Sequence, residues 1–399
     1  MFIDKISRSP YNERKQGESS MQSTKTNYEM KQYNFQTVFK IIQRYSSISR
    51  RELQNLSSLS WGSISSITAD MVSNGLIIEK SHKLGYSGRT PKLLTINNQK
   101  NRILGIDINV SAITFALCDL GGLVLQSERV RPQELHKSYI LSLIDEYIAK
   151  YFATYDEIIM IAFSVQGQID RTENISVSID KIDGWENVPL RSLFAEKYGR
   201  PVYIFHDPDC LLIYTLAKMR NFTDVNNCVA LRLSPDGIGF SALIDGNIYK
   251  GAGDTGIEIE HTTLVPNGQK CKCGRSGCFY AYCTLEGLSR QYKGGTYEEF
   301  LSLIRASETD ETSLRIFKNY SYYLAVAVQN LIMLFNPEYL FLNGEMTEYK
   351  KLFEKEFYLK LNNNYHSRVF FNSFDTEHPA VGAALLAVSR NLNELLFRD

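Results

Sequence analysis

Apolar residues near the start of the chain recur at helical spacing in three separate segments. Between residues 35 and 45 an apolar side chain returns every three or four positions, which predicts an amphipathic helix. Ser49 is followed three residues later by Glu52, the pattern of a capping box, and this pair predicts the start of a second helix. We expect a third helix over residues 61–73, because it carries inward-facing apolar positions and ends at Asn-Gly.

Two strands are expected after the third helix. Residues 76–78 and 93–96 are short apolar runs, and the segment between them is polar and rich in Gly and Pro. This order of elements, two helices, a turn, a third helix and a two-stranded flap, is that of a winged helix-turn-helix domain. The pattern predicts that the domain spans residues 29–100. Residues 1–28 are polar without periodicity and are predicted to form a flexible tail.

The rest of the chain alternates between strand and helix patterns in two similar rounds. The first round has strand patterns at 103–108, 113–118, 123–125 and 157–165 and a helix pattern at 138–151. The second begins with strands at 228–233 and 240–244. We therefore predict a duplicated α/β domain with lobes at 101–225 and 226–399, a cleft between them, and a chain end that is free to cross back to the first lobe.

Composition is typical of a globular protein rather than a membrane protein. The chain has 399 residues, 44% of them hydrophobic and 22% charged. It contains no run of eighteen apolar residues, and its start lacks the apolar core of a signal peptide. We expect a cytoplasmic protein with no membrane partner.

The zero net charge conceals an uneven distribution. Residues 1–100 contain fifteen Lys and Arg against seven Asp and Glu, whereas the remainder has an equal acidic excess. A basic front on an acidic body predicts that the front binds a polyanion such as double-stranded DNA, although a solvated face with a chance bias would give the same counts.

The candidate DNA contacts fall into two groups. A helix-turn-helix places the start of its third helix in the major groove, where this chain offers Ser60, Trp61, Ser63 and Ser65. Trp61 has the alternative of packing on the core of its own domain. Basic side chains suited to phosphates come from the second helix and the flap: Arg50, Arg51, Lys83 and Arg89. Arg89 lies between a Gly and a Pro, so it could enter a narrow minor groove and favour an A/T-rich operator.

Three of the seven cysteines lie within eight residues, which is not the pattern of a disulfide framework. Cys271, Cys273 and Cys278, together with His261, form a set of three thiolates and one imidazole that suits tetrahedral zinc. Four protein ligands leave no open position, so the predicted zinc is structural. The alternative is a group of buried free thiols, which is also how we interpret Cys118, Cys210, Cys228 and Cys283.

Several motifs together resemble one known family. They are 258–261 (Glu-Ile-Glu-His) with the cysteine cluster, 48–53 (Ile-Ser-Arg-Arg-Glu-Leu), 201–207, 237–239 (Gly-Ile-Gly) and 336–338 (Asn-Pro-Glu). From about residue 30 onward the chain resembles the repressor branch of the ROK family (repressors, open reading frames and sugar kinases). The resemblance implies an actin-like ATPase or ribonuclease H-like sugar-kinase fold behind the DNA-binding domain. It also implies a repressor of carbohydrate genes that acts as a homodimer or homotetramer.

The resemblance also implies an effector site. The family's catalytic base falls on Asp207, with His206 beside it, and the other sugar-contacting positions fall on Glu258, His261 and Tyr280. These five residues are predicted to bind a sugar or a sugar phosphate; a solvated cleft is the alternative.

Two phosphate-binding turns of the family are altered here. Val110 replaces a glycine of the first turn, and Asp236 in the second would repel phosphate. We therefore expect no kinase activity. Two other functions stay open: a working sugar kinase with an added DNA-binding domain, and a regulator whose effector is a partner protein.

Overall fold

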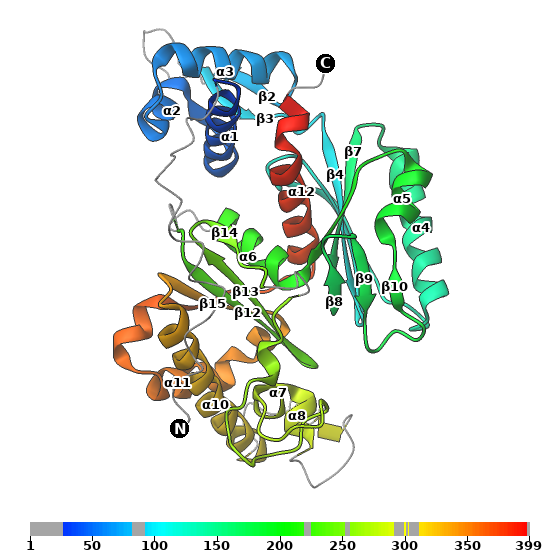
Figure 1. The fold of residues 1–399 in the computed structure, drawn as a ribbon, viewed down its shortest axis with the longest axis vertical. Coiled ribbons are helices and arrows are strands. Elements are labelled where there is room, and N and C mark those ends of the chain that lie inside the picture. The colour runs from blue at the N-terminus through cyan, green and yellow to red at the C-terminus, as the bar shows by residue number, and fades with distance from the viewer. Residues whose placement is uncertain are drawn as a thin grey trace, which may run out of the picture.

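A computed structural model describes residues 27–81, 92–218, 225–251, 256–290, 299–300, 302 and 311–396. Three parts follow one another along the chain: a small head, a first lobe and a second lobe (Figure 1). Among the described residues, no helix is long and apolar enough to cross a membrane.

The head is built from three helices and a small antiparallel sheet. Its helices are α1 (Asn27–Tyr45), α2 (Arg50–Ser57) and α3 (Trp61–Ser73). Three helices were predicted, but α1 begins two residues inside the predicted tail; residues 1–26 of that tail lie outside the described residues. The predicted capping box is present, with the Ser49 side chain accepting from the Glu52 amide and the Glu52 carboxylate accepting from the Ser49 amide. The two predicted strands form, and a third strand that the pattern did not indicate joins them, so the sheet order is β1-β3-β2. These strands are β1 (Ile48–Ser49), β2 (Ile77–Ser81) and β3 (Lys92–Ile96).

The first lobe contains a five-stranded sheet of order β11-β7-β4-β5-β6. Strands β4, β5 and β6 run antiparallel, whereas β4, β7 and β11 run parallel. A smaller sheet, β10-β9-β8, extends the lobe. The elements are β4 (Arg102–Asn109), β5 (Ala112–Cys118), β6 (Val124–Val130), α4 (Lys137–Thr154), β7 (Ile158–Val165), β8 (Gln168–Asp170), β9 (Ile175–Ser178), β10 (Glu186–Val188), α5 (Leu190–Tyr198) and β11 (Val202–His206).

The second lobe repeats the same arrangement of strands. Its sheet has the order β14-β13-β12-β15-β16, again with three antiparallel strands followed by two parallel ones. This repetition is the duplication that the two rounds of the sequence pattern predicted. The elements are β12 (Cys228–Ser234), β13 (Gly237–Ile244), β14 (Asn247–Ile248), η1 (Ile259–His261), α7 (Phe279–Cys283), α8 (Leu285–Ser289), α10 (Glu311–Phe335), β15 (Tyr339–Asn343), η2 (Glu345–Tyr349), α11 (Lys350–Lys360), η3 (Asn363–Arg368) and β16 (Val369–Phe371).

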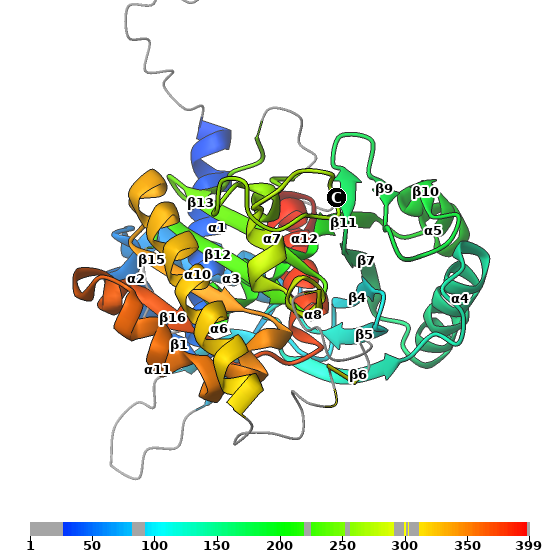
Figure 2. The same cartoon turned by 90° about the horizontal axis from the view of Figure 1, so that it is seen from below.

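Two helices occupy the space between the two large sheets. Helix α6 (Asp207–Lys218) connects the lobes and packs against β12 and β13, whereas α12 (His378–Leu396) returns from the second lobe and packs on β4 and β7 of the first. The two helices also pack against each other (Figures 1 and 2). The outer faces of the sheets are covered by α4 and α5 in the first lobe and by α10 and α11 in the second.

The head and the first lobe share one hydrophobic core. Buried side chains of α1 and α3 belong to the same cluster as residues of β4, β5 and α12. A hydrogen bond of 2.7 Å from Gln43 Nε2 of α1 to the carbonyl of Leu120 adds a polar link. The head is therefore packed against the lobe that carries α12.

We expect the packing of α12 on β4 to depend on the absence of a side chain at Gly105. A Cβ atom there would meet the carbonyl oxygen of Ala380 far inside van der Waals contact. Gly105→Ala is expected to lower the free energy of unfolding by about 1–3 kcal/mol through overpacking. Gly62→Ala, where a Cβ meets nothing closer than 3.9 Å, is the matched control and should not destabilise the protein in urea unfolding. Equal stability of the two variants would contradict this view of the packing.

Candidate functional site

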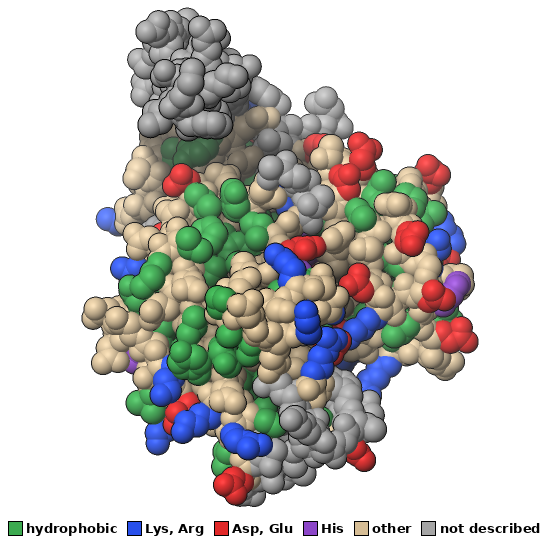
Figure 3. Space-filling view, turned by 60° about the horizontal axis from the view of Figure 1, so that its bottom comes forward, with side chains coloured by type: hydrophobic (Ala, Val, Ile, Leu, Met, Phe, Trp, Pro, Cys, Tyr) green, Lys and Arg blue, Asp and Glu red, His purple; other side chains and the backbone are tan. Residues whose placement is uncertain are grey.

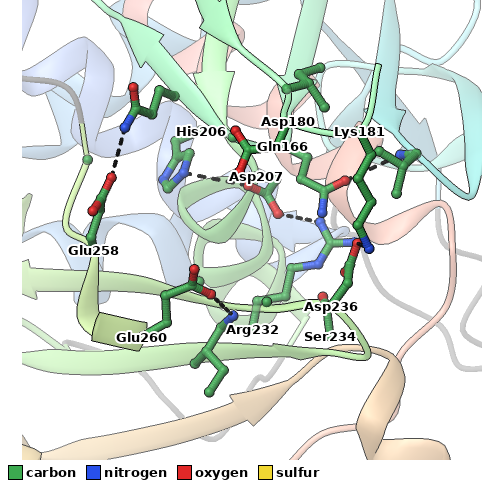
Figure 4. A pocket seen from close by; sticks show the side chains of 18 of the residues that line it. Gln166, Asp180, Lys181, His206, Asp207, Arg232, Ser234, Asp236, Glu258 and Glu260 are labelled. Carbon is green, nitrogen blue, oxygen red and sulfur yellow. Dashed lines mark hydrogen bonds and ion pairs between the residues drawn. The ribbon is translucent and has the colours of Figure 1, made fainter. Parts of the chain in front are cut away.

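A cavity of about 210 Å³, lined by several charged side chains, lies where the two lobes meet (Figure 4). Of the five predicted effector residues, His206, Asp207, Glu258 and His261 line it. His206 ends β11 and Asp207 begins α6, so both come from the connection between the lobes. Glu258 and His261 flank the short helix η1 of the second lobe. The fold thus brings together residues that are up to 55 positions apart in the chain.

Tyr280 departs from the prediction. Its side chain is fully buried in α7 and clusters with Cys271 and Cys278 instead of lining the cavity. Its ring lies behind His261, with 6.3 Å between the ring centroids. All five residues of α7 are buried, so the helix turns this side chain into the lobe. Tyr280 supports the cavity wall and does not reach the cavity.

Arg232 is the central cavity residue that the sequence analysis missed. It is 3% exposed, and its guanidinium donates to Asp207 Oδ2 and, at 2.7 Å, to Glu345 Oε1. Ser234 Oγ donates to the other oxygen of Glu345 at 2.9 Å. The available signal was a single charge in the otherwise uncharged, wholly buried strand β12, because a buried charge has to be paired.

The ion pair with Arg232 changes what Asp207 can do chemically. One carboxylate oxygen accepts from the guanidinium, and the other lies 3.7 Å from Nε2 of His206. The oxygen held by the guanidinium is already engaged as an acceptor, so the other oxygen is the one left to contact a ligand. Through that oxygen Asp207 can accept a hydrogen bond from a ligand hydroxyl.

A second buried ion pair anchors α6 to the first lobe. Arg171 Nη2 donates to Asp209 Oδ2 at 2.5 Å, and Ser241 Oγ of β13 donates to the other oxygen at 2.6 Å. Both charged side chains are at most 6% exposed. The first turn of α6 is thus fixed by an arginine from each lobe, Arg171 from the first and Arg232 from the second.

Three polar contacts bridge the lobes at the rim of the cavity. Lys181 of the first lobe pairs with Asp236 at 3.1 Å and with Glu286 at 3.3 Å, both in the second lobe. Gln168 Nε2 donates to Glu258 Oε1 at 2.8 Å. Asp236 was expected to face a phosphate and repel it; in the structure its charge is matched by Lys181.

Three backbone amides in the two altered turns are already hydrogen-bonded to side chains of the chain itself. The Val110 amide donates to Gln166 Oε1 at 3.3 Å, and the Ser111 amide donates to Asn109 Oδ1 at 2.9 Å. In the second turn the Ile238 amide donates to Glu260 Oε2 at 2.8 Å. A carboxylate of the protein thus occupies a place that a phosphate oxygen would need.

The predicted metal ligands converge on one point. The ligand atoms of His261, Cys271, Cys273 and Cys278 all lie within 4.8 Å of one another. Cys271 Sγ is 3.6 Å from His261 Nδ1, and Cys273 Sγ is 3.7 Å from Cys278 Sγ. Thiolates held about 2.3 Å from one tetrahedral zinc ion would lie about 3.8 Å apart, so this donor set fits the ion. The cluster can hold a metal.

The turn of the cluster depends on glycine. Gly274 and Gly277 both have positive φ, at 86° and 82°, and a Cβ at Gly277 would overlap the carbonyl of Val265. Cys118, Cys210, Cys228 and Cys283, which were expected in the core, are all buried.

The predicted DNA contacts on α3 lie at its exposed start. Trp61 is 52% exposed, so it does not pack into the core of the head, and Ser65 is exposed. Ser60 is the N-cap of the helix: its Oγ accepts from the Ser63 amide at 3.1 Å and lies 2.9 Å from Ser63 Oγ. Part of the hydrogen-bonding capacity of these two serines is thus used within the helix.

The basic residues predicted to bind phosphates differ in whether their side chains are free to contact DNA. Arg50 Nε donates to Thr68 Oγ1 of α3 at 2.8 Å, and Arg50 Nη2 pairs with Glu79 of β2 at 2.7 Å. Arg50 therefore ties three elements of the head together, contrary to the expectation that it serves mainly as a phosphate contact. Arg51 is exposed. Lys83 and Arg89 lie outside the described residues.

Comparison with solved structures defines the class of fold. The chain is similar to a ROK family transcriptional regulator, a homologue of the Escherichia coli MLC protein, with a TM-score of 0.72, 25% identity, and coverage of 92% of this chain and 98% of that one. A ROK family glucokinase from Streptomyces griseus matches 71% of this chain and 98% of its own, with a TM-score of 0.60 and 19% identity. The two lobes thus have the actin-like fold of sugar kinases.

The family follows from the sequence comparison. The ROK family model matches residues 103–390, so the chain belongs to the ROK family. The xylose repressor of Bacillus spizizenii is 25% identical over 384 residues, which is 91% of this chain and 97% of the relative. The N-acetylglucosamine repressor of Escherichia coli O157:H7 is 23% identical over 343 residues, or 81% of this chain and 83% of the relative.

Asp107, which lies beside this charged network, gives the site a pH dependence. Its side chain accepts from Ser164 Oγ at 2.6 Å, and burial, partly opposed by the charge of Arg232, raises the pKa of its carboxyl to about 7. An unfolded Asp has a pKa of about 3.9. Between this pH and about 7, the folded state keeps a proton on Asp107 that the unfolded state has lost. The stability that the protonated carboxyl contributes is therefore lost as the pH rises through about 7.

Asp107→Asn, which stays neutral at every pH and keeps the acceptor for Ser164, is expected to flatten the dependence of the unfolding free energy on pH. The wild-type free energy should fall more steeply from pH 5 to pH 7, by up to about 1.4 kcal/mol per pH unit. Urea unfolding at pH 5, 6 and 7 measures this difference. Asp145→Asn, at a partly exposed carboxylate paired with Lys197, is the control. Parallel curves for wild type and Asp107→Asn would show that Asp107 is ionised throughout.

Proposed function

We propose that this protein is a DNA-binding transcriptional repressor of carbohydrate genes that responds to a sugar-like effector. The observation that carries the proposal is the extent of the matches. The xylose repressor and the transcriptional regulator match 91% and 92% of the chain, which is more than the two lobes alone contain, whereas the glucokinase matches only 71% of it. The head is thus the part that distinguishes this chain from a sugar kinase.

The head is proposed to act as a winged helix-turn-helix. In that fold α3 enters the major groove, and the start of α3 presents Trp61, Ser63 and Ser65 to the base edges. Arg51, exposed at the start of α2, is assigned to a phosphate. Arg50 is left out because its guanidinium holds α2, α3 and β2 together.

The effector is proposed to bind in the cavity between the lobes. Asp207 and Glu258 offer carboxylate oxygens to ligand hydroxyls, and His206 offers an imidazole. His261 lines the same cavity and belongs to the cysteine cluster, so a metal held there would orient a residue of the effector site. We propose structural zinc as that metal, because all four positions of a tetrahedral ion would be filled by the chain.

The alternative of a sugar kinase with an added DNA-binding domain is disfavoured by the site. Arg232 neutralises the carboxylate at the position of the family's base, and side chains of the protein occupy the turn amides at Val110 and Ile238. The occupied amides oppose the binding of a nucleotide phosphate, and the carboxylate oxygen held by Arg232 is not available to a substrate hydroxyl.

A repressor that reads a palindromic operator needs two heads related by two-fold symmetry, so we propose a homodimer, or a homotetramer built from it. Helix α10 presents apolar side chains that could form such a contact. Tyr322 and Met333 are 50% and 62% exposed and lie eleven residues, or about three turns, apart on one side of the helix. Figure 3 shows hydrophobic side chains gathered on the second-lobe side of the molecule.

Purified protein is expected to carry about one zinc ion per chain, which elemental analysis measures directly. Cys273→Ser should lose the metal and lower the thermal stability of the protein, because metal binding is coupled to folding of the cluster. Cys228→Ala, a buried cysteine outside the cluster, should keep the zinc. Zinc-free protein from a preparation without chelators would contradict the assignment.

Arg51→Ala is expected to weaken binding to duplex DNA of mixed sequence and to reduce the slope of log affinity against log salt by about one unit, because one phosphate contact is lost. Fluorescence anisotropy at several salt concentrations measures the slope. Lys197→Ala, an exposed ion-paired lysine of the first lobe, is the control and should leave the slope unchanged. Arg50→Ala should instead lower the stability of the head. If the wild-type protein binds no duplex at low salt, the proposed function is wrong.

A further inference from the structure

The charges of the cavity indicate which class of effector it accepts, on the assumption that the protein is an effector-controlled repressor as proposed above. We infer that the cavity selects an unphosphorylated sugar or amino sugar and excludes its phosphate ester. The inference sharpens the prediction made from sequence, which named a sugar or a sugar phosphate without deciding between them.

Each lysine or arginine among the described residues that line the cavity is already paired with a carboxylate. Lys181 pairs with Asp236 and Glu286, and Arg232 pairs with Asp207 and Glu345. Lys272 lies 3.6 Å from Glu260 and 4.4 Å from the centroid of the Tyr280 ring. A phosphate group entering the cavity would have to break one of these pairs and leave a carboxylate without its partner.

Carboxylates outnumber cations in the lining. The acidic lining residues are Asp180, Asp207, Asp236, Glu258 and Glu260, against Lys181, Arg232 and Lys272. The space-filling view shows basic and acidic side chains next to one another where the lobes meet (Figure 3). A dianionic phosphate would be repelled by this excess, whereas hydroxyl and ammonium groups would donate to it.

The Ile238 amide of the second turn offers a phosphate no better binding site than the paired lysines and arginines do. Glu260 accepts from the Ile238 amide and also lies 3.3 Å from His261 Nε2. It therefore already provides, from within the chain, the negative charge at the second turn. A phosphate could use the Ile238 amide only by displacing this carboxylate into the same small cavity.

Two nitrogen atoms in the wall of the cavity have no hydrogen-bond partner within the described part of the chain. Both His206 Nδ1 and Arg232 Nε are buried, and no acceptor in the described part of the chain reaches either atom. Both residues line the cavity, and Figure 4 shows them on either side of Asp207. Because both atoms are fully buried, the contacts to sugar hydroxyls are assigned to the carboxylate oxygens of the lining, which accept hydrogen bonds from hydroxyl groups.

The test titrates the full-length protein with D-xylose, D-glucose, D-glucosamine and N-acetyl-D-glucosamine, with the 6-phosphates of the last three, and with inorganic phosphate. Thermal unfolding at constant ionic strength reports binding, since a ligand that binds only the folded state raises Tm. At least one unphosphorylated sugar should raise Tm. Its 6-phosphate, where included, should bind at least tenfold more weakly, and inorganic phosphate should act no differently from chloride.

The double variant Asp236→Asn/Glu286→Gln frees Lys181 and should gain at least tenfold in affinity for a sugar 6-phosphate. Asp145→Asn/Glu128→Gln removes the same number of charges from carboxylates that pair with lysines outside the cavity, and it should gain nothing. The inference is overturned if the wild type prefers a phosphate ester, if no sugar of the panel binds, or if the freed Lys181 adds no affinity for phosphate.

Binding of duplex DNA, measured on the same preparation, separates the two proposals. A protein that binds DNA but prefers a sugar phosphate refutes the inference and leaves the repressor function standing. A protein that binds no DNA refutes the function, while the sugar titrations still report the charge preference of the cavity.

Discussion

The arrangement of the cavity depends on one buried charge, the guanidinium of Arg232. A buried arginine has to be paired, and here it is held between Asp207 at the start of α6 and Glu345 at the start of η2. Removing the guanidinium would leave both carboxylates without their positively charged partner. The position of α6 and the place where the second lobe meets it are therefore set by the same ion cluster that forms one wall of the cavity.

Helix α6 also contacts, through its last residue, the part of the first lobe that is hydrogen-bonded to the head. Lys218, the last residue of α6, donates to the carbonyl of Gly122 at 3.3 Å. The neighbouring carbonyl, of Leu120, accepts from Gln43 of the head. With α12 packed alongside and sharing a core with α1, the cavity and the head are connected through continuous packing and hydrogen bonds. A repressor needs a physical connection of this kind between its effector site and its DNA-binding domain.

Patterns formed by residues close together in the sequence were enough to predict most of the helices and strands. The capping box at Ser49 and Glu52, the extent of α3 and the repeated order of strands follow from local propensity and periodicity, which act along the chain. The four metal-binding candidates were predictable for the same reason, since all lie within eighteen residues. Strand β1 was missed because a two-residue strand has no periodicity and exists only through its pairing with β3.

The sequence by itself determined the residue types: a capping box before the second helix, a cluster of thiolates and an imidazole, and turns in which Val110 and Asp236 stand at altered positions. The tertiary structure decided which groups face each other. It turned Arg50 into a support of the head, buried Tyr280 behind His261, matched Asp236 with Lys181 across the lobes and placed Arg232 on Asp207. These outcomes depend on residues up to 113 positions apart, such as Arg232 and Glu345, and no local pattern encodes a pairing at that separation. The electrostatic character of a cavity is a property of such pairings, because a charge that already has a partner no longer attracts a ligand.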